Sequence, residues 1–246
     1  MNRRWIFLRE GPLSRRGKWA VVGLTVLALL ILFPLRLALA MAAPPALTGS
    51  EVAGAVWNGR IADLRVGSLP LGTVQAGLRP LPLLIGRAEL AIARPGPAGT
   101  PDLSGVVGGG AGGTRLSRVN GQLALGEGFA DLPAASMAFR DFHLALAGGR
   151  CREAGGEVSL VLAPVSPLMP APLALSGKAR CAGPAVYVPM TGPTGMERLF
   201  LRIEPDGRWR AELVLAGLPA EVAAPLLEMG FAARPGGIGV TASGRM

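Results

Sequence analysis

Histidine and cysteine are almost absent from this 246-residue chain, which has one histidine, His143, and two cysteines, Cys151 and Cys181. A structural zinc site needs about four closely spaced His or Cys ligands, and one histidine with no second cysteine pair does not provide them. His143 lies between Phe142 and Leu144 in a predicted strand, without a serine or cysteine partner set for nucleophilic catalysis. We therefore interpret it as a surface or satisfied structural histidine.

Lysine and the acidic residues are also scarce. The chain has 16 Asp and Glu residues, and Lys18 and Lys178 are its only lysines, although its formal net charge is +9. Residues 1–18 alone carry six of the cations and a single anion. A nucleic-acid-binding domain concentrates its cations on the folded part. Here they precede an apolar segment, so the sequence predicts neither nucleic-acid nor nucleotide binding.

Aromatic residues make up only 5% of the chain, whereas Gly (36) and Pro (22) are abundant. The core must then consist mainly of aliphatic side chains. Because the Gly and Pro residues are spread between apolar stretches, they favour many short strands with frequent turns. We predict a mainly β fold: one N-terminal transmembrane helix, followed by a twisted antiparallel sheet or sandwich-like domain with one short helix at residues 219–229.

The glycine-rich run Gly108–Gly113 formally matches the dinucleotide-binding fingerprint. No predicted helix follows it, and no acidic residue about 20 residues later lies in a predicted βαβ unit, so we reject a cofactor site. There is no Walker A sequence and no Gly-x-Ser-x-Gly elbow. The surrounding segment, 94–113, has the densest Pro and Gly content and is predicted to be a long loop. No catalytic residue, cofactor or metal ligand is assigned.

The longest apolar run begins at residue 19. Residues 19–35 carry no charge, Arg36 interrupts the run, and residues 37–43 are apolar again. Seventeen helical residues span about 26 Å, just enough for the hydrocarbon core of a membrane. The cations Arg15, Arg16 and Lys18 stand directly before the run, which places the N-terminus in the cytoplasm by the positive-inside rule.

This pattern predicts three regions: a basic cytoplasmic segment (1–18), an anchor in the inner membrane of a Gram-negative envelope (19–40), and a periplasmic β-rich domain (44–246). The alternative is a signal peptide cleaved after Ala40, because Ala38-Leu39-Ala40 has the small-x-small form of a cleavage site. The apolar run exceeds the usual signal core, which favours an uncleaved anchor.

Both cysteines follow the predicted anchor. In the oxidising periplasm a Cys151–Cys181 disulfide is the default, and two free buried thiols are the alternative. Trp57, in the strand-and-turn sequence Val56-Trp57-Asn58-Gly59, has two interpretations: an aromatic core residue beside a tight turn, or an exposed contact for a partner.

The clearest secondary structure is a hairpin near the C-terminus. Apolar residues alternate with charged ones in 197–204 and in 208–215, and Pro205-Asp206-Gly207 separates the two strands. Period-two alternation is typical of strands with one wet face. Further strands are predicted at 51–57, 61–66, 71–78, 84–93, 115–125, 137–147, 157–162, 173–180 and 238–243.

Several motifs occur in an order that resembles one known family. They are the anchor, then Gly-Ala-Val-Trp-Asn-Gly at 54–59, Leu-Arg-Pro-Leu-Pro-Leu-Leu-Ile-Gly-Arg at 78–87, the two cysteines with nearby glycines, and Leu-Glu-Met-Gly-Phe at 227–231. Together they resemble protein N of the type II secretion system. The resemblance implies a non-enzymatic accessory component that associates with other inner-membrane subunits and helps folded proteins cross the outer membrane. It also implies a structural disulfide between Cys151 and Cys181.

A second hypothesis is a periplasmic lipid-handling or envelope-maintenance protein of the AsmA-like kind, which also has one anchor before β-rich repeats. It requires an open apolar groove, whereas the first hypothesis is compatible with a closed core. Nothing in the sequence supports a periplasmic hydrolase.

Overall fold

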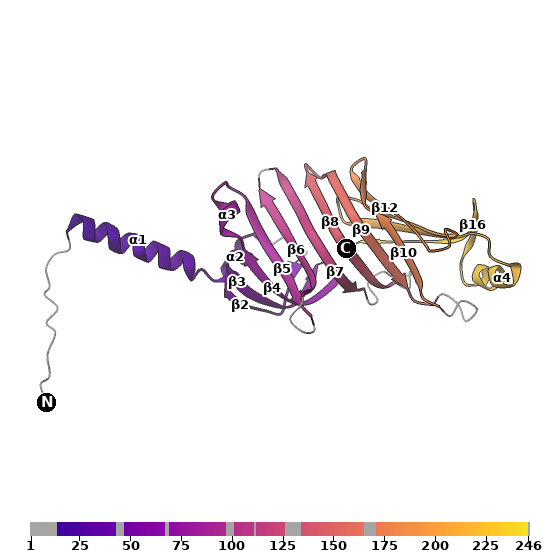
Figure 1. Cartoon of the computed structure of the whole chain (residues 1–246), viewed down its shortest axis with the longest axis horizontal. Helices are drawn as coiled ribbons and strands as arrows, with labels where there is room; N and C mark the ends of the chain where they lie inside the picture. Colours follow the sequence, from indigo (N-terminus) through magenta and orange to yellow (C-terminus); the bar gives the residue numbers. More distant parts are fainter. Residues whose placement is uncertain are drawn as a thin grey trace, which may run out of the picture.

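The chain forms a long antiparallel sheet preceded by two helices (Figure 1). The computed structural model describes residues 14–42, 47–66, 69–96, 101–110, 112–125, 134–164 and 171–245. Most of the predicted basic segment, residues 1–13, and the first residues of the predicted periplasmic domain, 44–46, lie outside this range.

The helices are α1 (Arg15–Ile31), α2 (Leu35–Ala42), α3 (Pro80–Leu83) and α4 (Ala220–Glu228). The first strands are β1 (Leu47–Thr48), β2 (Glu51–Ala55), β3 (Asn58–Val66), β4 (Leu69–Leu78), β5 (Ala88–Pro95), β6 (Pro101–Gly110), β7 (Gly113–Ala124) and β8 (Ala134–Ala147). The remaining strands are β9 (Arg150–Leu162), β10 (Leu173–Lys178), β11 (Arg180–Ala182), β12 (Ala185–Thr191), β13 (Glu197–Ile203), β14 (Arg208–Leu215), β15 (Ala232–Arg234) and β16 (Gly237–Arg245).

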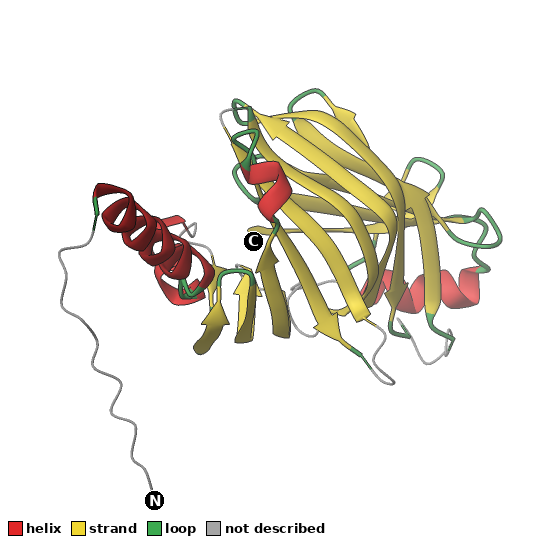
Figure 2. Ribbon diagram, turned by 60° about the vertical axis from the view of Figure 1, so that its left-hand side comes forward, coloured by secondary structure: helices red, strands yellow, loops and turns green. Residues whose placement is uncertain are grey.

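Strand order in the sheet follows the sequence almost without exception. Among the described residues, sixteen strands run in the order β1-β3-β4-β5-β6-β7-β8-β9-β10-β12-β13-β14-β16-β15, with β2 paired to β3 and β11 paired to β12. Neighbouring strands are antiparallel. The sheet is twisted and curled rather than flat (Figure 2). The predicted mainly β, antiparallel fold with a short C-terminal helix is confirmed.

The predicted C-terminal hairpin forms β13 and β14, and its apolar residues face the main core. Leu199 pairs with Leu213 and Leu201 with Ala211, and all four side chains are buried. The same core contains buried residues of β7 to β10 and of α4, where Leu226 is fully buried. The inner face of this half of the sheet is therefore closed.

Three of the register shifts in the sheet occur at non-glycine residues with positive φ: Asp63 in β3, Arg118 in β7 and Asp141 in β8. Asn120 links the last two, since its Oδ1 accepts from the Asp141 N–H at 2.8 Å and its Nδ2 donates to the Arg118 carbonyl at 3.2 Å. Because a bulge increases local twist, bulges on neighbouring strands favour curvature.

The prediction of a long loop at 94–113 is wrong. Residues 101–110 form β6, which pairs with β5 on one side and β7 on the other. Gly105 fits here because a Cβ at that position would lie only 3.2 Å from Val119 Cγ2. Residues 84–87 do not start a strand as predicted, because helix α3 and a turn precede β5.

The hairpin turn between β13 and β14 offers a pH-dependent prediction. The backbone N–H of Arg208 donates to Asp206 Oδ1 at 3.1 Å, and this bond, with the Arg208 charge, lowers the pKa of Asp206 below its ordinary value. The stabilisation is present above the unfolded-state pKa of about 4 and is lost as pH falls through the folded value. We expect the Tm difference between wild type and Asp206→Asn to be positive at pH 6 and to shrink towards pH 2. A constant difference would contradict this.

Candidate functional site

The N-terminal helices join the sheet at a break in the predicted single helix. Helix α1 ends at Ile31, and Pro34, which has no N–H to continue a helix, forms a β-bridge with Ala55. The Phe33 carbonyl accepts from the Val56 N–H at 2.8 Å. The connection between α1 and α2 thus lies alongside β2 as a short extended segment.

Trp57, in the turn between β2 and β3, connects the end of α1 to the β2–β3 hairpin. Its indole Nε1 donates to the carbonyl of Leu30 at 2.8 Å. Leu30 lies in the last turn of α1, where carbonyls lack helical partners, so the indole satisfies one of them. The half-buried Trp57 packs on the core formed by α2 and β2 to β4. Its backbone carbonyl would lie 2.5 Å from a Cβ at Gly77, so glycine is needed on the facing strand.

Leu35, the first residue of α2, holds the second helix in place. It is 1% exposed and packs in a small core with Val56, Ile61 and Val74. A Cβ at Gly59 would collide with the Leu35 side chain, so the glycine of the β2–β3 hairpin makes room for it. We call the contacts of Leu30, Phe33, Pro34 and Leu35 with the β2–β3 hairpin the helix junction.

Trp57→Phe tests the indole bond of the helix junction. The variant keeps the ring but removes the N–H, which we expect to cost about 1 kcal/mol and to speed amide exchange at the end of α1 roughly fivefold. Hydrogen exchange read by mass spectrometry measures this. Trp19→Phe is the control, because Trp19 is 71% exposed and makes no described contact with the sheet. Equal exchange in the two variants would show that the indole bond does not hold the helix.

The predicted anchor flanks lie on the two helices. Arg15, Arg16 and Lys18 are in the first turn of α1, where Ser14 Oγ accepts from the Gly17 N–H at 3.2 Å, and Arg36 is exposed on α2. No residue of α1 is buried. Within the described ranges, none of the helices combines the length and apolarity needed to cross a membrane.

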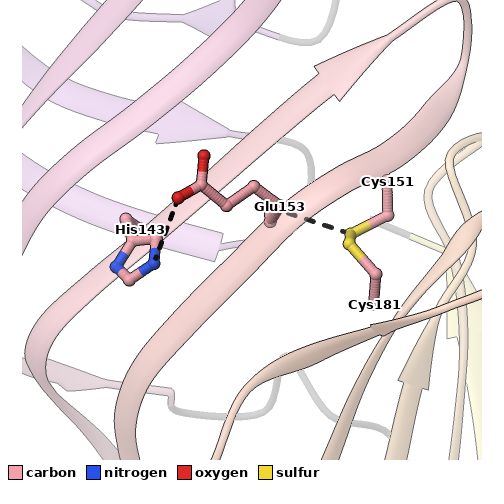
Figure 3. Close-up of a disulfide and its surroundings, with 4 residues drawn as sticks. All are labelled: His143, Cys151, Glu153 and Cys181. Atoms are coloured by element: carbon pink, nitrogen blue, oxygen red, sulfur yellow. Dashed lines mark hydrogen bonds and ion pairs between the residues drawn. A yellow bond between two sulfur atoms is a disulfide. The ribbon is translucent and has the colours of Figure 1, made fainter.

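Cys151 and Cys181 form a disulfide, so the predicted pairing is confirmed (Figure 3). Strand β10 pairs with β9 up to Lys178, but β11 pairs only with β12. Cys181 lies on β11 and Cys151 near the start of β9. The disulfide therefore connects two strands, β9 and β11, that do not pair with each other, beside the bond from the Cys151 N–H to the Pro184 carbonyl at 2.8 Å.

His143 lies on the sheet surface near this disulfide (Figure 3). Its Nε2 is 3.9 Å from Glu153 Oε1, its Nδ1 is 3.2 Å from the Asp141 carbonyl, and both the His143 and Glu153 side chains are exposed. The ring covers Gly155 on the neighbouring strand, where a Cβ would lie 2.5 Å from it. Within the described residues, no group of three or more His, Cys, Asp or Glu could hold a metal ion.

One arrangement was not predicted from the sequence. Arg87, Arg115 and Arg152 line a cavity of about 450 Å³ at the ends of central strands, where the β6–β7 and β8–β9 hairpins turn. They come from three segments up to 65 positions apart, so only the strand register brings them together. We call these three residues the arginine rim.

Comparison with known families assigns the chain. Residues 45–241 match the model of type II secretion system (T2SS) protein N. The chain belongs to this family. The match covers almost the whole sheet and begins after α1 and α2. The resemblance inferred from the sequence motifs is confirmed. The family consists of secretion accessory proteins and is not a known enzyme family. No curated protein and no solved structure gives a match.

Proposed function

We propose that this member of the protein N family is a non-enzymatic accessory and assembly component of the type II secretion system at the inner membrane. The segment 19–40 tethers the chain, the N-terminus is cytoplasmic, and the sheet lies in the periplasm. Its partners are other inner-membrane subunits of the secretion machine, and its task is to aid export of folded proteins across the outer membrane.

The family match is the observation that carries this proposal. Three further features support it. No residue of α1 is buried, and its large apolar residues are exposed, such as Leu24 at 70%. The cations Arg15, Arg16 and Lys18 stand at its start. A disulfide suits an oxidising compartment.

The helix junction suggests what the accessory does mechanically. Because Leu30, Phe33 and Leu35 are bonded to or packed on the β2–β3 hairpin, the sheet is fixed to the helices rather than connected by a free linker. A component attached in this way presents its sheet to partners at a defined height and orientation above the membrane.

Crosslinking in native membranes with the full-length chain, followed by affinity purification and mass spectrometry, tests the proposal. We expect secretion-system inner-membrane subunits to be enriched over a control purification from the deletion strain. We also expect deletion to lower the amount of secreted protein and the full chain to restore it. Unchanged secretion and no enriched subunit would overturn the proposal.

The lipid-handling alternative has its own readout in the same purification. That role needs an open apolar groove, whereas Met190, Leu199 and Leu213 fill the inner face of the C-terminal half and are fully buried. This closed core favours the secretion proposal. Phospholipid that co-purifies at a fixed ratio, without secretion subunits, would support the alternative instead.

A further inference from the structure

The segment between β4 and β5 exposes an unusual amount of apolar surface. Leu81 is 76% exposed, Leu84 82% and Ile85 69%. The backbone here is ordered by its own hydrogen bonds: Ile85 N–H to the Pro82 carbonyl at 3.1 Å and Gly86 N–H to the Leu83 carbonyl at 3.0 Å. These side chains are therefore held outward on a defined turn. We call Leu81, Leu84 and Ile85 the apolar turn.

The arginine rim lies directly beside the apolar turn, because Ile85, Gly86 and Arg87 line the same cavity. None of the three rim arginines forms an ion pair with a described residue. Among the described residues that line the cavity, Glu89 is the one acidic residue, and it pairs with Arg79 at 3.5 Å. The cavity thus has an excess of positive charge available for an anionic group.

The position of this surface in the molecule indicates its occupant. In both views α3 lies on the side of the sheet towards α1 (Figures 1 and 2). Helix α1 exposes apolar side chains along its whole length. The apolar turn and the arginine rim are therefore neighbours of the segment that we propose as the membrane tether.

We propose that the apolar turn and the arginine rim form a second membrane contact, specific for anionic phospholipid. The apolar turn enters the interfacial layer, and Arg87, Arg115 and Arg152 bind lipid phosphates. Exposed aliphatic side chains bordered by cations are the combination that binds such surfaces. Guanidinium groups match phosphate geometry, with two parallel N–H donors. This inference rests on the tether of the proposed function.

A membrane fits this surface better than a protein partner. The apolar side chains stand outward on a turn instead of lining a groove, and they are more than two thirds exposed. The free charges around the cavity are of one sign, as anionic headgroups require. Two contacts, α1 and the apolar turn, would also prevent the sheet from rotating about the tether.

Photo-crosslinking tests the contact. The full-length chain, carrying a photoreactive side chain at Leu84, is reconstituted into phosphatidylcholine vesicles with or without phosphatidylglycerol. The matched control carries it at Met229, an exposed apolar residue directly after α4, which lies at the opposite end of the sheet from α3 (Figure 1). We expect a lipid adduct at position 84, at least about tenfold above position 229, and more of it when phosphatidylglycerol is present. Equal adducts at the two positions would overturn the proposal.

The arginine rim is tested by Arg87→Gln/Arg115→Gln/Arg152→Gln, with Arg198→Gln/Arg210→Gln/Arg245→Gln as the control of equal charge. Thermal unfolding confirms that both variants fold. We expect only the rim variant to lose the effect of phosphatidylglycerol, by roughly tenfold. Inorganic phosphate could instead raise the Tm of the wild type but not of the rim variant, with the same amount of lipid adduct in both. In that case the rim binds free anions and the proposal is wrong. A protein adduct at position 84 in native membranes would also overturn it. Flotation of the chain with the vesicles measures the tether alone, so failure of the tether can be distinguished from failure of this second contact.

Discussion

Leu35→Ala is expected to release the N-terminal helices from the sheet. Leu35 is 1% exposed and fills the core between α2 and the β2–β3 hairpin. Truncating a fully buried leucine removes its apolar contacts and leaves a cavity, at a cost of about 2–5 kcal/mol. The loss falls on the helix junction, because the other buried residues of this small core come from β3, β4 and the turn after β2.

Hydrogen exchange at the Val56 amide measures this effect, because that N–H bonds to the Phe33 carbonyl. We expect exchange at least roughly thirtyfold faster in Leu35→Ala, which corresponds to the lower bound of the cost. Leu37→Ala is the matched control, since Leu37 lies two residues after Leu35 on α2 and is 48% exposed. If the orientation of the sheet matters for secretion, Leu35→Ala also lowers the secreted amount and Leu37→Ala does not. Equal exchange in both variants would rule out Leu35 as the fastening residue.

Cys151→Ala/Cys181→Ala is expected to destabilise the sheet by about 3–4 kcal/mol, because the disulfide closes a loop of 30 residues in the unfolded chain. For a domain of this size that corresponds to a Tm lower by roughly 6–16 °C. The effect includes the loss of the covalent link between β9 and β11, which do not pair with each other in the sheet.

Thermal unfolding with and without a reductant separates the crosslink from the side-chain change. Wild type under reducing conditions should unfold near the temperature of the double variant, and the reductant should leave the double variant unchanged. A reductant-insensitive wild type with an unstable double variant would instead assign the effect to packing of the buried Cys151.

The sequence was most informative where one strand has one wet face. In β13 and β14 the alternation of apolar and charged residues predicts both strands and their turn, because neighbouring strands in sequence also pair in space. The helix at 220–228 could be predicted from the residues at its ends. Pro219 precedes its first residue, and Gly230, which adopts φ +97°, stops it.

Predictions failed where pairing on both sides overrides composition. Residues 101–110 are rich in glycine and resemble a loop, yet β5 and β7 supply hydrogen-bond partners along both edges. Proximity in space is equally hidden. The Trp57–Leu30 contact joins residues 27 positions apart, and the arginine rim depends on the register of β6 to β9. No local pattern reports such distances.

The strand order has a consequence for how the chain matures. Because β3 to β10 each pair with the strand that precedes them, every new strand meets its template already in place as the chain emerges from the N-terminus onwards. Such local topology shortens the search for partners and speeds folding. The last strand made is the open edge at each stage, so a chain interrupted before β16 would leave β14 unpaired along its whole outer side and available for aggregation.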